Sequence, residues 1–202
     1  MRKRSWSALA LSSATAGLVV LAAAPAAAAE PTNRQLLEQC NNGTDTCVFH
    51  PDGPPQYYTG PARQVGDSVY NCTNGVQRFN VSWSDTTSQS NSVGIAMTTE
   101  AGFGEAFAVS YEQSYEHTWK TSHTESQTTY VDTGPYQVGW VERQPRMERV
   151  SGTYEMHFGD PYYGHYIWYV PFEARGPASD GASEAIVQHN RDMTDAEKAA
   201  CP

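Results

Sequence analysis

The chain has 202 residues and carries 13 Lys and Arg against 22 Asp and Glu, which gives a formal net charge of −9. An acidic surface repels phosphate backbones, so nucleic acid is excluded as a partner. The same charge gives no help in approaching an anionic membrane or cell wall.

The first 29 residues have the pattern of a secretory signal peptide. A basic segment at 2–4 precedes the apolar stretch Ala8 to Leu21, and a run of alanines at 27–29 predicts cleavage after Ala29. We therefore expect a secreted, extracellular protein. Without the three basic residues at 2–4, residues 30–202 keep 10 basic and 22 acidic side chains, a net charge of −12. These 173 residues suit one domain with a sizeable core.

Residues 30–66 are predicted to form an N-terminal extension. Thr32 or Asn33 can cap a short helix that runs through Gln39. Several prolines between 51 and 61 then forbid a regular helix and favour an extended or turning path. We expect this extension to lie over a surface, outside the core, and to dock into a partner. Its expected contact residues are Leu36, Leu37, Tyr57 and Tyr58.

Four cysteines in an exported chain predict two disulfides, and three pairings are possible. Cys40 and Cys47 enclose a turn-rich hexapeptide, which favours a local bridge. Cys72 would then pair with Cys201 and tie the C-terminus to the start of the β region. No Cys-x-x-Cys pair is present, so the spacing does not favour a zinc site.

Residues 67–173 read as strands in which apolar and polar residues alternate, with the β region beginning near Ser68. The clearest alternation runs through Phe107 and Trp119, and it predicts one long strand from Ala106 to Thr129. Other predicted strands centre on Phe79–Trp83, Val93–Met97, Tyr136–Trp140, Val150–Phe158 and Tyr166–Val170, with Pro145 interrupting a connection. Strands at this spacing predict an all-β fold: an elongated antiparallel two-sheet sandwich with long strands.

The last segment, 174–202, is predicted to be a tail with one short helix. Thr194 and Glu197 have the spacing of a capping box, and the helix would end at Cys201.

No motif in the sequence indicates catalysis, and we expect no enzyme activity, no cofactor and no metal site. His117 and His123 would lie about 20 Å apart on an ideal strand, too far to share an ion. His50-Pro51-Asp52 is interpreted as a turn. Glu112 and Glu116 would share a strand face, and a glycosidase that uses this carboxylate pair is the enzymatic alternative.

Aromatic residues cluster between 162 and 169. Tyr162 and Tyr163, next to Pro161 and Gly164, are expected to be exposed and to bind a partner, because tyrosine suits interfaces. Tyr166 and Trp168 are expected in the core, since Val170 and Phe172 continue their side of the strand.

The Ser/Thr-rich strands together with the segment 130–142 resemble the long-strand part of aerolysin-like, ETX/MTX2-type β proteins over roughly residues 79–158. That resemblance implies an elongated β body and, in many members, a pore made from amphipathic hairpins. The corresponding hairpin would be Ser92 to Tyr111. Its incoming side alternates only at Val93, Ile95 and Met97, against the roughly 9–11 residues that a membrane strand needs.

The layout of signal, extension, β body and two disulfides is similar to the bridging subunit of umbrella toxin particles. This resemblance implies a small protein that joins a toxin-bearing stalk to a lectin subunit in an antibacterial assembly. We therefore expect a non-enzymatic adaptor whose partners are other secreted proteins of a multi-subunit assembly. The alternative is an aerolysin-type pore-forming toxin, and only this alternative involves a membrane.

Overall fold

The computed structural model describes residues 30–202, so the expected signal peptide lies outside the described residues. Pro31–Pro202 forms one compact unit. Its secondary structure is mostly antiparallel β, which confirms the predicted all-β class. The elements, in chain order, are α1 (Asn33–Leu37), β1 (Thr46–Pro51), β2 (Gln56–Thr59), β3 (Arg63–Tyr70), β4 (Gln77–Ser88), β5 (Ser90–Asn91), α2 (Gly102–Tyr115), β6 (Ser122–Thr133), β7 (Gln137–Gln144), β8 (Arg146–Tyr162), β9 (His165–Pro177), β10 (Ala185–Asp192) and α3 (Asp195–Ala199).

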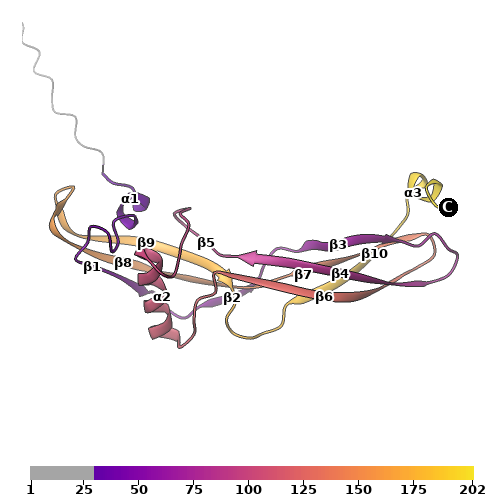
Figure 1. Ribbon diagram of the computed structural model, residues 1–202, viewed down its shortest axis with the longest axis horizontal. Helices are drawn as coiled ribbons and strands as arrows, with labels where there is room; N and C mark the ends of the chain where they lie inside the picture. Colours follow the sequence, from indigo (N-terminus) through magenta and orange to yellow (C-terminus); the bar gives the residue numbers. More distant parts are fainter. Residues whose placement is uncertain (1–29) are drawn as a thin grey trace, which may run out of the picture. The chain divides into compact units, whose positions relative to one another are not determined.

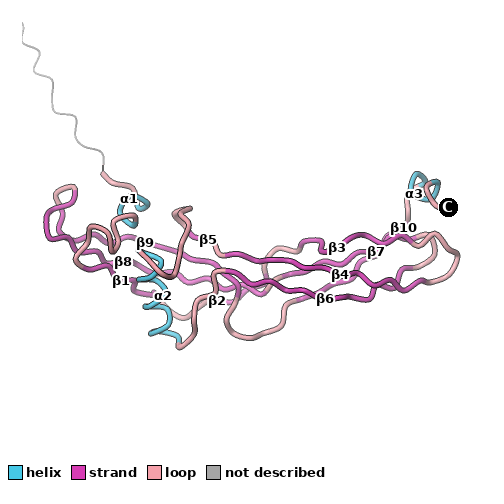
Figure 2. The backbone as a smooth tube through the Cα atoms, viewed as in Figure 1, coloured by secondary structure: helices cyan, strands magenta, loops and turns pink. Residues whose placement is uncertain are grey.

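The strands form three sheets (Figures 1 and 2). A five-stranded sheet has the order β1-β8-β9-β5, and β2 pairs with β8 on the same side as β1. A three-stranded sheet has the order β10-β7-β3, and β4 pairs with β6 to make a two-stranded ribbon. β8 has 17 residues, about three times the usual length of about 5–6. None of the helices between residues 30 and 202 has the length and hydropathy needed to cross a bilayer.

The main core lies between the five-stranded sheet and the helices α1 and α2 (Figure 1). Phe49 of β1 is its central residue, with ring centroids 5.0 Å from Phe107 and 5.1 Å from Tyr154. Gly152 of β8 lies directly under this ring, where a Cβ atom would collide with Phe49 and with the backbone of His50. The close approach of β1 to β8 therefore requires glycine at this position.

A second, smaller core forms where the β4–β6 ribbon packs on the three-stranded sheet. Its buried residues are Val65, Val81, Trp83, Val131 and Val141. They come from alternate positions of β3, β4, β6 and β7, as the alternation around Phe79–Trp83 predicts. This packing is the predicted two-sheet sandwich, whereas the five-stranded sheet is covered by helices instead of a second sheet.

The predicted long strand from Ala106 to Thr129 is wrong in its first half. Gly102–Tyr115 is the helix α2, and β6 begins only at Ser122. The buried positions of α2 recur at helical spacing, and they are Phe103, Gly104, Ala106, Phe107, Ser110 and Tyr111. Aromatic residues at 107, 111 and 115 fit both a period of two and a period near four. Val109 is exposed, which only the helical period explains.

The hairpin expected from Ser92 to Tyr111 is also absent. Residues 92–101 form no strand, and the segment that follows is helical. Met97 is buried, and Val93 and Ile95 pack against the core. The alternating apolar residues at 93–97 therefore belong to a loop that packs on the core, and they do not form a strand.

The N-terminal segment is not an extension laid over the surface, because its strands belong to the five-stranded sheet. β1 pairs with β8 from Thr46↔His157 to Pro51↔Gly152, and β2 pairs with the next part of β8. The prolines stand at the ends of these short strands, where a missing N–H donor is tolerated. The capped helix near Thr32 is confirmed as α1.

At the other end of the chain, the capping box of Thr194 and Glu197 is confirmed at α3. The strand β10, which pairs with β7 along its whole length, was not predicted. The expected core position of Tyr166 is wrong, since its side chain is exposed, whereas Trp168 is half-buried against the core. The predicted disulfides Cys40–Cys47 and Cys72–Cys201 are both present.

The two disulfides close loops of very different length, with sequence separations of 7 and 129 residues. Loop-closure entropy predicts that replacing Cys72 and Cys201 by Ser lowers the free energy of unfolding by about 5 kcal/mol, and the same change at Cys40 and Cys47 by about 2 kcal/mol. Urea unfolding of both double variants measures the difference. Equal losses would show that native packing around each bridge, and not loop length, sets its contribution.

Candidate functional site

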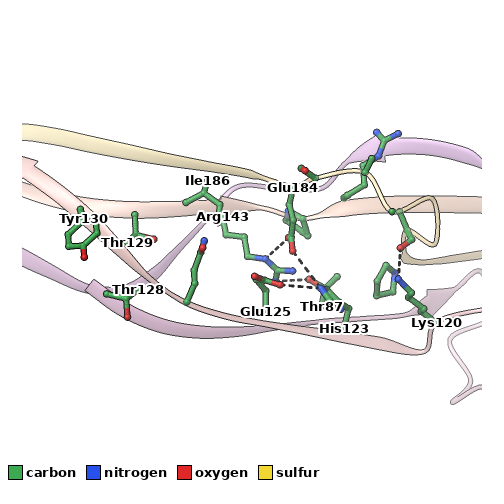
Figure 3. Close-up of a pocket in the computed structure, with 18 residues that line it drawn as sticks. Thr87, Lys120, His123, Glu125, Thr128, Thr129, Tyr130, Arg143, Glu184 and Ile186 are labelled. Carbon is green, nitrogen blue, oxygen red and sulfur yellow. Dashed lines mark hydrogen bonds and ion pairs between the residues drawn. The ribbon is translucent and has the colours of Figure 1, made fainter. Parts of the chain in front are cut away.

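A buried arginine joins the β4–β6 ribbon to the three-stranded sheet. The Arg143 side chain on β7 is only 1 % exposed. Its guanidinium donates to the Asp85 carboxylate at 2.5 Å and to Glu184 at 2.6 Å, and Figure 3 shows the contact with Glu184. Arg63 on β3 donates to the same Asp85 carboxylate at 2.8 Å. The contact between the two sheets is therefore made by an ion-pair network at this point.

Along β4 and β7, every second residue continues to face inward, but at this network the inward-facing residues change from apolar to charged. On β7, Arg143 follows Val141 on the buried side, and on β4 Asp85 follows Trp83. Burial by itself lowers the pKa of Arg143, but the hydrogen bonds and charges of Glu184 and Asp85 raise it above its ordinary value. A buried guanidinium is tolerated only with such partners.

A cavity of about 750 Å³ lies next to this network (Figure 3). It is bounded by β6, by β7 and by the loop that leads into β10. Thr87 and Arg143 line it together with His123, Glu125 and Glu184. Ionisable side chains therefore line the cavity, and the buried Arg143 is one of them.

Replacing Arg143 by Met would leave the carboxylate of Glu184 without its buried partner. We expect the free energy of unfolding to fall by about 3–5 kcal/mol, as when one member of a buried ion pair is removed. Chemical denaturation measures this loss. The matched control is Arg78→Met, because Arg78 pairs with Asp132 on the exposed side of the ribbon and should shift the midpoint far less. An equal effect of the two substitutions would contradict the role of Arg143.

A second buried ionisable group lies in the five-stranded sheet. Glu148 of β8 is fully buried and accepts hydrogen bonds from the Tyr111 hydroxyl at 3.0 Å and from Ser179 at 3.2 Å. Burial raises the pKa of Glu148, and the two hydrogen bonds oppose this rise. Burial likewise raises the pKa of Tyr111. Through these two hydrogen bonds, Glu148 holds the C-terminal part of α2 and the loop at 178–184 against β8.

Because the pKa of Glu148 is higher in the folded protein than the ordinary value of 4.5, the folded state binds this proton more tightly. The contribution of Glu148 to stability is thus full below pH 4.5 and is lost as pH rises through the folded pKa. Glu148→Gln should remove this decline, so the difference in unfolding free energy between variant and parent should grow from pH 4 to pH 7. Glu112→Gln, on the exposed side of α2, is the control. A pH-independent difference would contradict the assignment.

The expected partner-binding residues have different fates. Leu36 and Leu37 are buried in the main core and are not accessible to a partner, which corrects the prediction for both. They face inward because α1 packs its apolar side on the sheet. Tyr57 and Tyr58 lie half-buried on β2, where the guanidinium of Arg146 is 5.3 Å from the centre of the Tyr57 ring.

Tyr162 and Tyr163 lie at the turn between β8 and β9. Tyr162 is half-buried and stacks on Phe158 with centroids 5.0 Å apart, whereas Tyr163 is exposed. The pairing of β1 with β8 reaches only His157, so the β8–β9 hairpin continues without β1 beside it. Tyr166 is exposed on this part of the hairpin, whereas Ile167 and Tyr169 pair with His157 and Glu155 and are exposed on the face of β9 that points away from the core. Strand periodicity predicts Tyr166 in the core, because it does not say where the elements that cover a strand end.

The residues of the enzymatic alternative do not form a site. Glu112 and Glu116 are exposed on α2 and at its C-terminal cap, and no strand presents them side by side. His117 is exposed in the segment that follows α2. His50 lies on β1 and pairs with Glu155 at 3.2 Å, so the predicted turn at His50-Pro51-Asp52 begins later than expected.

No protein-family model and no curated protein matches this chain. Three solved structures are similar to it at low levels. One is a protein from Bacteroides vulgatus proposed to be a pore-forming toxin, with a TM-score of 0.32 and 8 % identity over 74 % of this chain. This match spans 57 % of that protein, just over half of its length.

The second is the parasporin-2 toxin of Bacillus thuringiensis, which recognizes cancer cells, with a TM-score of 0.23 and 16 % identity over 73 % of this chain and 76 % of that one. The third is the binary complex of Cry23Aa1 and Cry37Aa1, with a TM-score of 0.20 and 11 % identity over 74 % of this chain and 90 % of that one. TM-scores and identities this low establish neither a common fold nor a common activity.

Proposed function

We propose that the protein is a secreted, non-enzymatic adaptor of an extracellular antibacterial toxin complex, in which it joins a toxin stalk to a lectin-like partner. The toxin context comes from the resemblance to the bridging subunit of umbrella toxin particles. Secretion rests on the signal-peptide pattern, and the two disulfides are compatible with it. The adaptor role is supported by two surfaces that a partner can contact, one on the β8–β9 hairpin and one at the edge of β2.

The observation that carries the proposal is the exposed apolar surface of the β8–β9 hairpin. We call Tyr163, Tyr166, Ile167 and Tyr169 the hairpin surface; each of these side chains is between 43 % and 63 % exposed. Tyrosine provides a large apolar area with a polar group and little rotamer entropy, and it is enriched among the residues that dominate binding energy. Because β1 ends opposite His157, a partner can approach Tyr163 and Tyr166 at the end of the hairpin without displacing a strand, and it can approach Ile167 and Tyr169 on the opposite face of β9.

The strand β2 offers a second contact. It pairs with β8 on one side only, and in residues 30–202 no strand pairs with its other edge. Such an edge presents free N–H and C=O groups to which an extended peptide can add as a further strand. Tyr58 stands next to this edge. Two surfaces on different strands of the five-stranded sheet are what a connector requires.

The pore-forming alternative is favoured by one observation on the ribbon. β4 and β6 have 12 residues each, enough to span a bilayer as β-strands, and their exposed side is lined by hydroxyls. Three cross-strand hydroxyl pairs, Ser82–Thr128, Ser84–Ser126 and Thr86–Thr124, lie within 2.9 Å. The opposite side, however, carries Asp85, His123 and Glu125. A pore made by this ribbon would have to turn these ionisable groups toward lipid, which is costly, and for this reason we propose the adaptor first.

The test is a pull-down from native culture fluid with tagged residues 30–202 as bait. We expect the parent protein to retain a defined secreted partner, and Tyr166→Ser with Tyr169→Ser to weaken that binding at least about tenfold. Tyr130→Ser is the control, because Tyr130 is equally exposed but lies on the ribbon. Dye release from vesicles by the purified protein, or unchanged binding after the double substitution, would contradict the adaptor proposal.

A further inference from the structure

The cavity beside Arg143 brings together an imidazole and two carboxylates from separate parts of the chain. His123 and Glu125 are neighbours on the inner side of β6, and Glu184 stands at the end of the loop before β10 (Figure 3). One donor atom from each of the three lies within 4.8 Å of the other two. All three side chains are partly buried and line the cavity of about 750 Å³.

The separations between these donors are those of metal ligands and not of hydrogen bonds. His123 Nε2 is 3.5 Å from Glu125 Oε2 and 3.7 Å from Glu184 Oε1. Hydrogen bonds between nitrogen and oxygen have lengths of about 2.7–3.2 Å. Two ligands that are each about 2.1 Å from a tetrahedral ion are about 3.4 Å apart. Shifts of a few tenths of an ångström therefore bring His123 to this spacing from each carboxylate, and the two carboxylate oxygens lie within 4.8 Å of one another.

The surrounding side chains orient one ligand and leave a negative charge. Arg143 donates to Glu184 Oε2, which leaves Oε1 of the same carboxylate facing His123. Asp85 stands directly opposite Glu125 on the ribbon, a like-charge pair that cross-strand packing disfavours. Arg63 and Arg143 together neutralise two of the three carboxylates Asp85, Glu125 and Glu184, so one negative charge remains in this cluster when His123 is neutral. Of the other cations that line the cavity, Arg146 pairs with Asp180 and Lys120 donates to the Ala178 carbonyl. The remaining charge of the cluster favours a cation beside Glu125 and Glu184.

We propose that His123, Glu125 and Glu184 bind a divalent transition metal, with Zn²⁺ as the best fit to one imidazole and two carboxylates. Zinc accepts nitrogen and carboxylate oxygen in tetrahedral geometry, and a water would complete four ligands. Hydrogen bonding of Glu184 by Arg143 is the kind of outer-shell contact that fixes a ligand. The ion would link the ribbon to the segment that enters the three-stranded sheet. This link would add to the one that the Arg143 network makes.

The experiment is calorimetric titration of Zn²⁺ into chelator-treated protein, with Co²⁺ as a spectroscopic substitute. We expect one Zn²⁺ per chain, an absorption spectrum typical of tetrahedral Co²⁺, and a higher melting temperature with Zn²⁺. His123→Gln and Glu125→Gln should each weaken Zn²⁺ binding at least about tenfold and remove the shift in melting temperature. Both replacements keep the side-chain size, and neither residue belongs to the Arg143 ion pairs.

The matched control is His189→Gln. His189 also faces a glutamate, Glu142 at 3.2 Å, but has no third ligand nearby, so its replacement should leave Zn²⁺ binding unchanged. Equal loss of binding in all three variants would overturn the proposal. So would a parent protein that takes up no Zn²⁺ at pH 7.5, because the three side chains would then form only a polar cluster beside the Arg143 network.

Discussion

The continuous pairing of β8 is the constraint on which the rest of the structure depends. This strand provides hydrogen-bond partners for β1, β2 and β9, and one side of it supplies the floor of the main core. Its alternation is strict from Val150 to Phe158, so a slip by one residue would expose the entire buried side. The N-terminal strands are held in place by this register and by the Phe49 ring over Gly152. Segments far apart in the sequence are joined through β8, and the sheet they form provides the surface that both helices cover.

The two cores differ in how they are completed. Around Phe49 and Phe107 the five-stranded sheet is closed by aromatic rings from α2, and this contact is apolar except where Tyr111 donates to Glu148. Between the ribbon and the three-stranded sheet, the apolar contact ends after Trp83, and charged groups centred on Arg143 take its place. A buried ion-pair network contributes less net stability than apolar packing of the same volume, but it fixes one arrangement of the two sheets. The cavity is lined by ionisable side chains because it lies where the contact between the two sheets changes from apolar to charged residues.

The sequence correctly predicted those elements whose residue spacing is compatible with only one type of secondary structure. The strands around Val81 and Tyr154, the capped helices after Thr32 and Thr194, and both disulfides were all correct. Helix α2 was missed because aromatic residues at every fourth position satisfy a strand as well as a helix. The candidate site was missed as well: His123 was compared with His117 on the same segment, whereas its neighbours in space are Glu125 and Glu184.

By itself, the sequence determined the β class, the acidic charge and the caps, because each of these follows from residue identity and short-range spacing, and the short Cys40–Cys47 loop favoured the disulfide pairing that the structure has. Only the tertiary structure decided that Leu36 and Leu37 are core, that the hairpin surface is exposed, and that Glu184 meets His123. The physical reason is that burial and side-chain proximity depend on which strands pair and where each pairing stops. Such long-range choices are fixed by the packing of the whole chain and leave no periodic signal in any one segment.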